Sequence, residues 1–177
     1  MKLLFSLFIA LSLTTVGRAA DPVTVTDVRI KEIQARQYLC AKKQLKLAEL
    51  PDFATKTIAD LYQKAAELKL GQAGPVVITY HDFRGDPEQT FTAELAVPIF
   101  VENVKDVNPF YVRKDAKVKC ASVIYQGPLS GMGEAWQNFV TKAMAKGNAT
   151  GDSREVFLYW EGHDSANNII ELQVELK

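Results

Sequence analysis

A glutamate inside an otherwise apolar segment is the first residue that could carry out chemistry. Glu94 follows Phe91 and two small residues, and it precedes Leu95 in a stretch typical of a strand. A buried carboxylate is costly unless something pairs with it. A cationic ligand among aromatic rings would be such a partner, through charge and cation–π attraction. The alternative is that strand alternation turns Glu94 toward solvent.

A second carboxylate and several aromatic side chains complete the predicted set. Glu171 lies in a similar strand-like segment near the end of the chain. The alternative for the aromatic candidates, above all for Trp136, is simple core packing, because aromatic side chains are common on strands and on apolar helix stripes. The predicted ligand-binding residues are Glu94, Glu171, Tyr80, Tyr159, Trp136 and Phe91.

The chain offers no convincing metal or cofactor motif. His81 and Asp82 precede Asp86 and Glu88, but their spacing matches no established metal-site pattern, and a solvated turn explains them better. We therefore expect no metal site and no cofactor.

The first twenty residues differ from the rest of the chain. Lys2 precedes an uncharged apolar run, and small residues follow at 17–20, which is the order of a secretory signal peptide. We expect cleavage near residue 20, a secreted or periplasmic product, and no membrane span after signal removal. In an oxidising compartment Cys40 and Cys120 are candidates for a disulfide, the alternative being two ordinary buried thiols.

The remaining residues, 21–177, suit one domain. The 21 basic residues equal the 21 acidic ones, and removal of Lys2 and Arg18 leaves a small acidic surplus. A nucleic-acid-binding protein would usually show a basic stripe, so no nucleic-acid partner is expected.

The order of elements repeats within this domain. Extended segments are predicted at 23–44 and 111–126, helices at 53–70 and 129–146, and pairs of strands at 75–80 with 90–99 and 155–160 with 168–176. Matching residues include Cys40 with Cys120, Tyr80 with Tyr159, and Glu94 with Glu171. The repeat predicts an α+β fold of two strand–helix–strand–strand halves, about 23–102 and 110–177, related by a pseudo-two-fold axis with a central groove.

This duplicated order resembles the GyrI-like family, also called AraC-type effector-binding domains. The resemblance is carried by Gly74-Pro75 before 78–82, by 91–99, by Gln126-Gly127-Pro128, and by 154–157 and 170–174. It implies an aromatic groove with an acidic residue that binds cationic or amphipathic small molecules. Many members are fused to DNA-binding regulators, a role that does not fit an exported chain.

The favoured interpretation is an exported, non-enzymatic protein that holds a small cationic or amphipathic molecule. One alternative is a small hydrolase that uses the same groove, with Glu94 activating water or protonating a leaving group. Another is a module that binds a protein partner.

Overall fold

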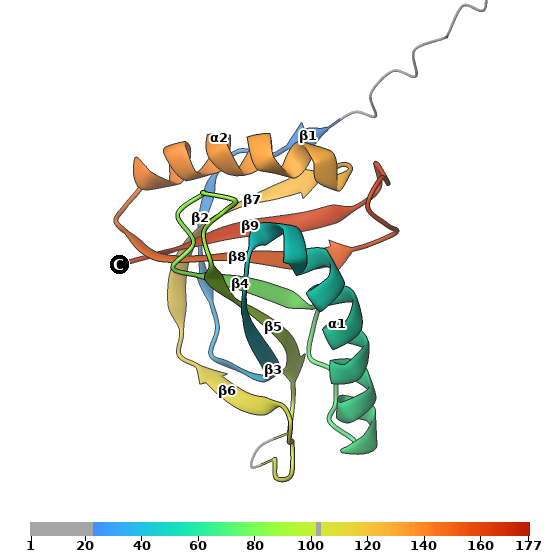
Figure 1. Cartoon of the computed structure of the whole chain (residues 1–177). Helices are drawn as coiled ribbons and strands as arrows, with labels where there is room; N and C mark the ends of the chain where they lie inside the picture. Colours follow the sequence, from blue (N-terminus) through green and yellow to red (C-terminus); the bar gives the residue numbers. More distant parts are fainter. Residues whose placement is uncertain (1–22, 102–103) are drawn as a thin grey trace, which may run out of the picture.

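The structure, a computed structural model, describes residues 23–101 and 104–177 as an antiparallel sheet with two helices (Figure 1). The predicted signal peptide lies outside the described residues. The strands run in the order β1-β7-β9-β8-β4-β5-β3-β6, and β2 also pairs with β7. No helix in the described part of the chain is long and apolar enough to cross a membrane.

The predicted repeat is present as two similar units. The first comprises β3 (Arg36–Leu45), α1 (Leu50–Glu67), β4 (Val77–His81) and β5 (Phe91–Ile99). The second comprises β7 (Val118–Gln126), α2 (Met132–Met144), β8 (Ala149–Tyr159) and β9 (Ile169–Leu176). Short 3-10 turns, Leu47–Glu49 and Leu129–Gly131, precede the two helices. Hydrogen bonds between β4 and β8 join the units edge to edge into one continuous sheet.

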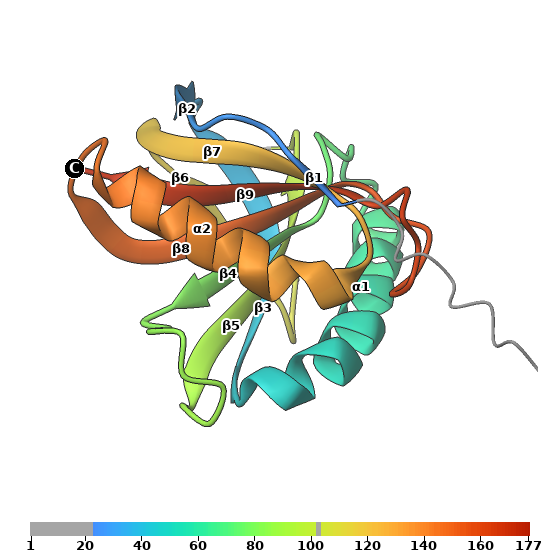
Figure 2. The same cartoon turned by 90° about the horizontal axis from the view of Figure 1, so that it is seen from above.

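Both helices cover the same face of this sheet (Figure 2). Apolar residues at helical spacing form the buried stripe of each helix, for example Leu61 and Ala65 on α1, and Ala135 and Phe139 on α2. Each stripe packs on the side chains that alternate toward it from the strands, such as Leu95 and Leu172. Phe157 contacts both clusters and so connects the two cores.

The two units exchange their outer strands. Strand β2 (Arg29–Ile33) precedes β3 in the chain but pairs with β7 of the second unit. Strand β6 (Tyr111–Asp115) precedes β7 but pairs with β3 of the first unit. A short strand β1 (Thr24–Val25) also pairs with β7. The predicted halves are therefore continuous in sequence but interlocked in space.

The strand register shows which residues correspond across the pseudo-two-fold axis. Glu94 lies opposite Thr79, and Glu171 lies opposite Val156, so these glutamates are equivalent. On the axis itself Ile78 of β4 is paired with Glu155 of β8. Each is the counterpart of the other.

Two of the matched pairs expected from the sequence are corrected by this register. Tyr80 lies opposite Ala93, and its counterpart opposite Ile170 is Phe157. Tyr159 follows an irregularity in β8 that shifts the register, and a sequence overlay cannot detect that shift.

The two cysteines do not occupy equivalent positions in the two units either. Cys40 of β3 lies opposite Ala96 of β5, whereas Cys120 of β7 lies opposite Glu175 of β9. The strands β9, β8, β4 and β5 separate β3 from β7 along the sheet. Both cysteines are buried free thiols, which corrects the predicted disulfide and agrees with the alternative of two ordinary buried residues.

Candidate functional site

Glu94 faces away from the helices, and residues of the exchanged strand β6 provide its hydrogen-bond and ion-pair partners. Its side chain is buried, the Tyr111 hydroxyl donates a hydrogen bond to it, and the Arg113 guanidinium forms an ion pair with it. The solvent-facing alternative for Glu94 is therefore wrong. Because Arg113 already balances its charge, Glu94 does not require a cationic ligand.

Glu171, the equivalent carboxylate, is paired with the other exchanged strand. Lys31 Nζ of β2 lies 2.5 Å from Glu171 Oε1. Lys31 is 41% exposed and Glu171 only 9%. Glu171 borders a cavity of about 310 Å³ at the junction of the units, on the open face of the sheet. Val77, Val156 and Pro98 contribute apolar walls to this cavity. Among the described residues, Tyr38 is the single aromatic side chain that lines it.

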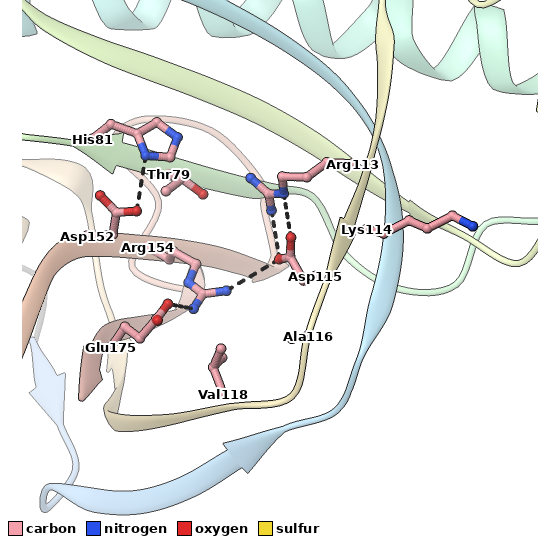
Figure 3. Close-up of a pocket in the computed structure, with 10 residues that line it drawn as sticks. All are labelled: Thr79, His81, Arg113, Lys114, Asp115, Ala116, Val118, Asp152, Arg154 and Glu175. Atoms are coloured by element: carbon pink, nitrogen blue, oxygen red, sulfur yellow. Dashed lines mark hydrogen bonds and ion pairs between the residues drawn. The ribbon is translucent and has the colours of Figure 1, made fainter. Parts of the chain in front are cut away.

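A second cavity on the open face contains a histidine that the sequence reading assigned to a solvated turn. His81 is the last residue of β4 and only 30% exposed. Its Nδ1 lies 3.1 Å from Asp152 Oδ2, and its Nε2 lies 3.8 Å from Glu94 Oε2. His81 and Asp152 line a charged cavity of about 260 Å³ (Figure 3). The sequence gives no direct sign of this pair, because Asp152 belongs to the other unit.

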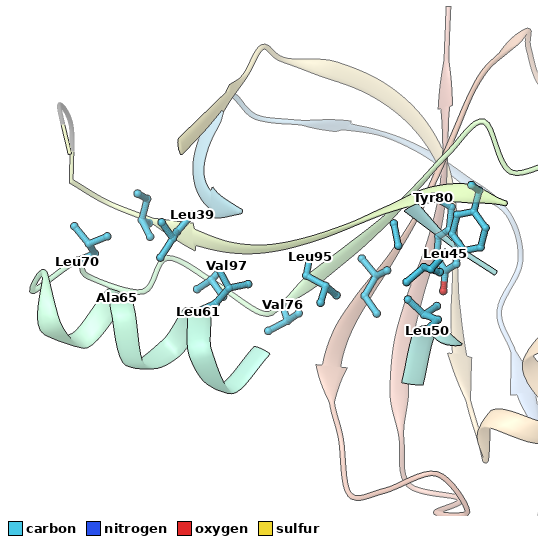
Figure 4. Close-up of a cluster of buried hydrophobic side chains, with 14 residues drawn as sticks. Leu39, Leu45, Leu50, Leu61, Ala65, Leu70, Val76, Tyr80, Leu95 and Val97 are labelled. Carbon is cyan, nitrogen blue, oxygen red and sulfur yellow. The ribbon is translucent and has the colours of Figure 1, made fainter. Parts of the chain in front are cut away.

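Three of the predicted aromatic residues, Tyr80, Phe91 and Trp136, lie on the helix side of the sheet, near a different glutamate. Glu155 of β8 is buried, and the Trp136 indole of α2 donates a hydrogen bond of 2.8 Å to its Oε1. The Tyr80 hydroxyl of β4 also interacts with this carboxyl. Tyr80 stacks on Phe91 with ring centroids 5.7 Å apart, at the end of the first core cluster (Figure 4).

The Glu155 carboxyl has an unusual electrostatic setting. Burial raises its pKa from 4.5 to about 7, an effect only partly offset by the hydrogen bonds from Trp136 and Tyr80. Burial and the nearby negative charge of Glu155 also raise the pKa of Tyr80. Among the buried carboxylates of residues 23–101 and 104–177, Glu94 and Glu171 have basic partners, and Glu155 has none. Glu155 therefore has donors but no counter-charge.

The predicted residues thus divide between two faces. Trp136 and Tyr80 contact Glu155, and Phe91 stacks on Tyr80 beside them. Glu94 and Glu171 lie on the opposite face of the sheet. Tyr159 is 48% exposed and hydrogen-bonds to Glu161, so it contributes to neither group.

Sequence reasoning did not single out Glu155, although one signal was available. Glu155 is two residues before Phe157, so strand alternation places both on the same face.

Comparison with known proteins gives one family match. A sequence profile of the GyrI-like small molecule binding domain matches residues 26–177. No curated protein sequence matches the chain.

Several solved structures share the fold. The C-terminal domain of EcmrR superposes with a TM-score of 0.70 at 17% identity, over 85% of this chain and 97% of that one. This chain spans 58% of the longer EcmrR chain seen in a complex with DNA. SAV2435 bound to tetraphenylphosphonium has a TM-score of 0.57 at 13% identity, over 86% of this chain and 94% of that one. A hydrolase encoded by lin2189 from Listeria innocua has a TM-score of 0.59 at 12% identity, over 83% and 91%. At such identities the similarity shows the fold alone.

Proposed function

We propose, from the premise that this chain belongs to the GyrI-like small-molecule-binding domain family, that it holds a cationic or amphipathic small molecule against Glu155. The observation that carries the proposal is a buried carboxylate with aromatic neighbours and no basic partner among the described residues. An ionised carboxylate in such a setting is costly, and a bound cation would lower that cost.

The aromatic neighbours suit a cation with apolar substituents. Trp136 and Tyr80 both direct polar hydrogens at Glu155 while their rings offer π surfaces. Cation–π attraction contributes most where water is excluded. Trp136 is half-buried, so part of its side chain remains accessible to solvent while its indole bonds Glu155. The related fold of SAV2435 binds tetraphenylphosphonium, which has this chemistry.

The other two buried glutamates fit this role less well. A ligand at Glu94 would have to compete with the Arg113 ion pair and the Tyr111 hydrogen bond. A ligand at Glu171 would have to displace Lys31. Glu155 needs no such exchange, so the proposed acidic residue moves from Glu94 to Glu155.

Titration with tetraphenylphosphonium tests the proposal. Trp136 fluorescence reports binding in a Trp160→Phe background, because the chain has 2 tryptophans. We expect Glu155→Gln to weaken binding at least tenfold, which corresponds to ~1.4 kcal/mol. Glu171→Gln is the matched control, since it neutralises a glutamate on the opposite face. Equal binding by the Glu155→Gln variant and the parent protein would refute the proposed site.

Export is the second part of the proposal. The charged, apolar and small-residue segments of positions 1–20 support it. Expression of the full chain in a bacterium, followed by fractionation and intact-mass measurement, tests it. A periplasmic product that lacks about twenty residues is expected, and a full-length cytoplasmic product would contradict export.

A hydrolase remains the second candidate, now with Glu155 in place of Glu94. The supporting observation is a carboxyl whose pKa of about 7 allows it to take up or release a proton near neutral pH. Incubation with a panel of esters and strained rings, read by mass spectrometry for added water, tests this candidate. Turnover lost in Glu155→Gln with binding retained would identify an enzyme, whereas no turnover of any compound would favour the binder.

A further inference from the structure

A cavity on the open face of the sheet, opposite the helices, contains an unused buried hydroxyl. Thr79 of β4 is only 3% exposed, and its Oγ1 has no hydrogen-bond partner among the described residues. Thr79 lies on the wall of the charged 260 Å³ cavity (Figure 3). A buried hydroxyl without a partner is destabilising, and a ligand atom in the cavity would supply the missing partner.

The neighbour of Thr79 across the β4–β8 junction offers a second donor. Arg154 lies directly opposite Thr79 in the strand register and is almost as deeply buried. Its Nη2 donates a hydrogen bond of 2.9 Å to Glu175, whereas its Nη1 lies 3.9 Å from Asp115 Oδ2, beyond hydrogen-bond distance. Thr79 and Arg154 therefore present two adjacent donors to the cavity, which suits a carboxylate.

The rest of the lining has both signs of charge. Besides Arg154 and the imidazole of His81, its basic side chains are Arg113 and Lys114, and its acidic side chains are Asp115, Asp152 and Glu175. A simple anion would meet as many negative as positive groups. A molecule with both charges can satisfy both sets, with its carboxylate at Thr79 and Arg154 and its cation at the rim. Asp152, which is 42% exposed, is an accessible rim carboxylate.

We propose that this cavity binds a small zwitterion with an α-amino-acid headgroup, independently of the site at Glu155. The cavity is below the ~300 Å³ typical of the smallest drug-sized sites, which favours a compact polar ligand. Residues of both units contribute to it, since Thr79 comes from β4 and Arg154 from β8. Ligand binding would therefore connect the two units on the face opposite the helices.

Ligand-observed NMR with the full chain and the common L-amino acids tests the proposal. The strongest binder is then compared with its N-acetyl form, which lacks the ammonium group, and with its methyl ester, which lacks the carboxylate. We expect either change to weaken binding about tenfold or more, a factor that corresponds to ~1.4 kcal/mol. Failure of every amino acid to bind, or equal binding of the N-acetyl form, would overturn the proposed ligand class.

Variants of Thr79 locate the binding. Thr79→Val removes the hydroxyl at similar volume and should weaken binding about tenfold, whereas Thr79→Ser retains the hydroxyl and should bind as the parent does. Thr141→Val, on the outer surface of α2, is the matched control. Tetraphenylphosphonium affinity should be the same in all of them. Parent-like amino-acid binding by Thr79→Val would place the site elsewhere and refute the assignment.

Discussion

Because the pKa of Glu155 is raised in the folded protein, we expect the free energy of unfolding to depend on pH. The pKa of this carboxyl is raised from 4.5 to about 7 in the folded protein because burial penalises the charged form. At ~1.4 kcal/mol per pKa unit, this rise corresponds to about 3 kcal/mol. Replacement by glutamine removes the titration and keeps an acceptor for the Trp136 indole.

The sign of the effect follows from proton binding. Between pH 4.5 and about 7 the folded state holds a proton on Glu155 that the unfolded state has released. Stability from this group is therefore complete below pH 4.5 and is lost as the pH rises through about 7. The parent protein and Glu155→Gln should be equally stable at low pH, and the variant should be about 3 kcal/mol more stable at about pH 8.

Urea unfolding of both proteins between about pH 5 and pH 8 measures this difference directly, because titrations common to both cancel. Glu171→Gln is the control. It removes the ion pair with Lys31, so it should not gain stability on going to higher pH. A stability difference between the parent and Glu155→Gln that stays constant with pH would refute the assignment of a raised pKa to Glu155.

Four further predictions concern binding and packing. Calorimetry should show that tetraphenylphosphonium affinity rises about tenfold per pH unit up to about pH 7 and is constant above it, because the cation binds ionised Glu155. An affinity independent of pH would contradict the charge pairing. Thr79→Val should raise the free energy of unfolding by about 1 kcal/mol, since it removes an unpartnered hydroxyl; a loss of stability in urea unfolding would show that the hydroxyl is satisfied. Arg113→Met should lower the free energy of unfolding in urea by about 3–5 kcal/mol, because it leaves the buried Glu94 carboxylate unpaired. Adding Glu94→Gln should restore part of this loss, and no restoration would mean that lost packing dominates. Phe139→Ala should cost about 3–5 kcal/mol in the same assay through loss of the main anchor of α2; a cost below about 1 kcal/mol would contradict its core role.

The family resemblance and the fold class inferred from the sequence are confirmed by the profile match and the shared fold. The repeat was visible because helix stripes such as that of Ala135 and Phe139 depend on local spacing alone. The exchange of β2 and β6 was not visible, because strand pairing between distant segments leaves no mark in local periodicity.

The candidate site was predictable only in part. Tyr80, Phe91 and Trp136 were identified by residue type, but alternation could not say which face of the sheet each would occupy. Glu94 stood out because its neighbours are apolar, yet its partners Tyr111 and Arg113 come from an exchanged strand. Glu155, which Trp136 and Tyr80 contact, was not selected from the sequence, because its partners come from segments far apart in the chain.

The pairing of Ile78 with Glu155 on the pseudo-two-fold axis has a consequence for how such a site can arise. In a dimer of identical subunits, a residue on the axis occurs twice, face to face with its own copy. An acid there would meet a second acid in a buried setting, and an apolar residue would meet a second apolar residue. Joining the two units in one chain removes this constraint, so that a single carboxylate can stand alone at the centre with a neutral neighbour. Duplication and fusion of the two units thereby allow a single carboxylate on the pseudo-two-fold axis, which a strictly symmetric dimer could not have.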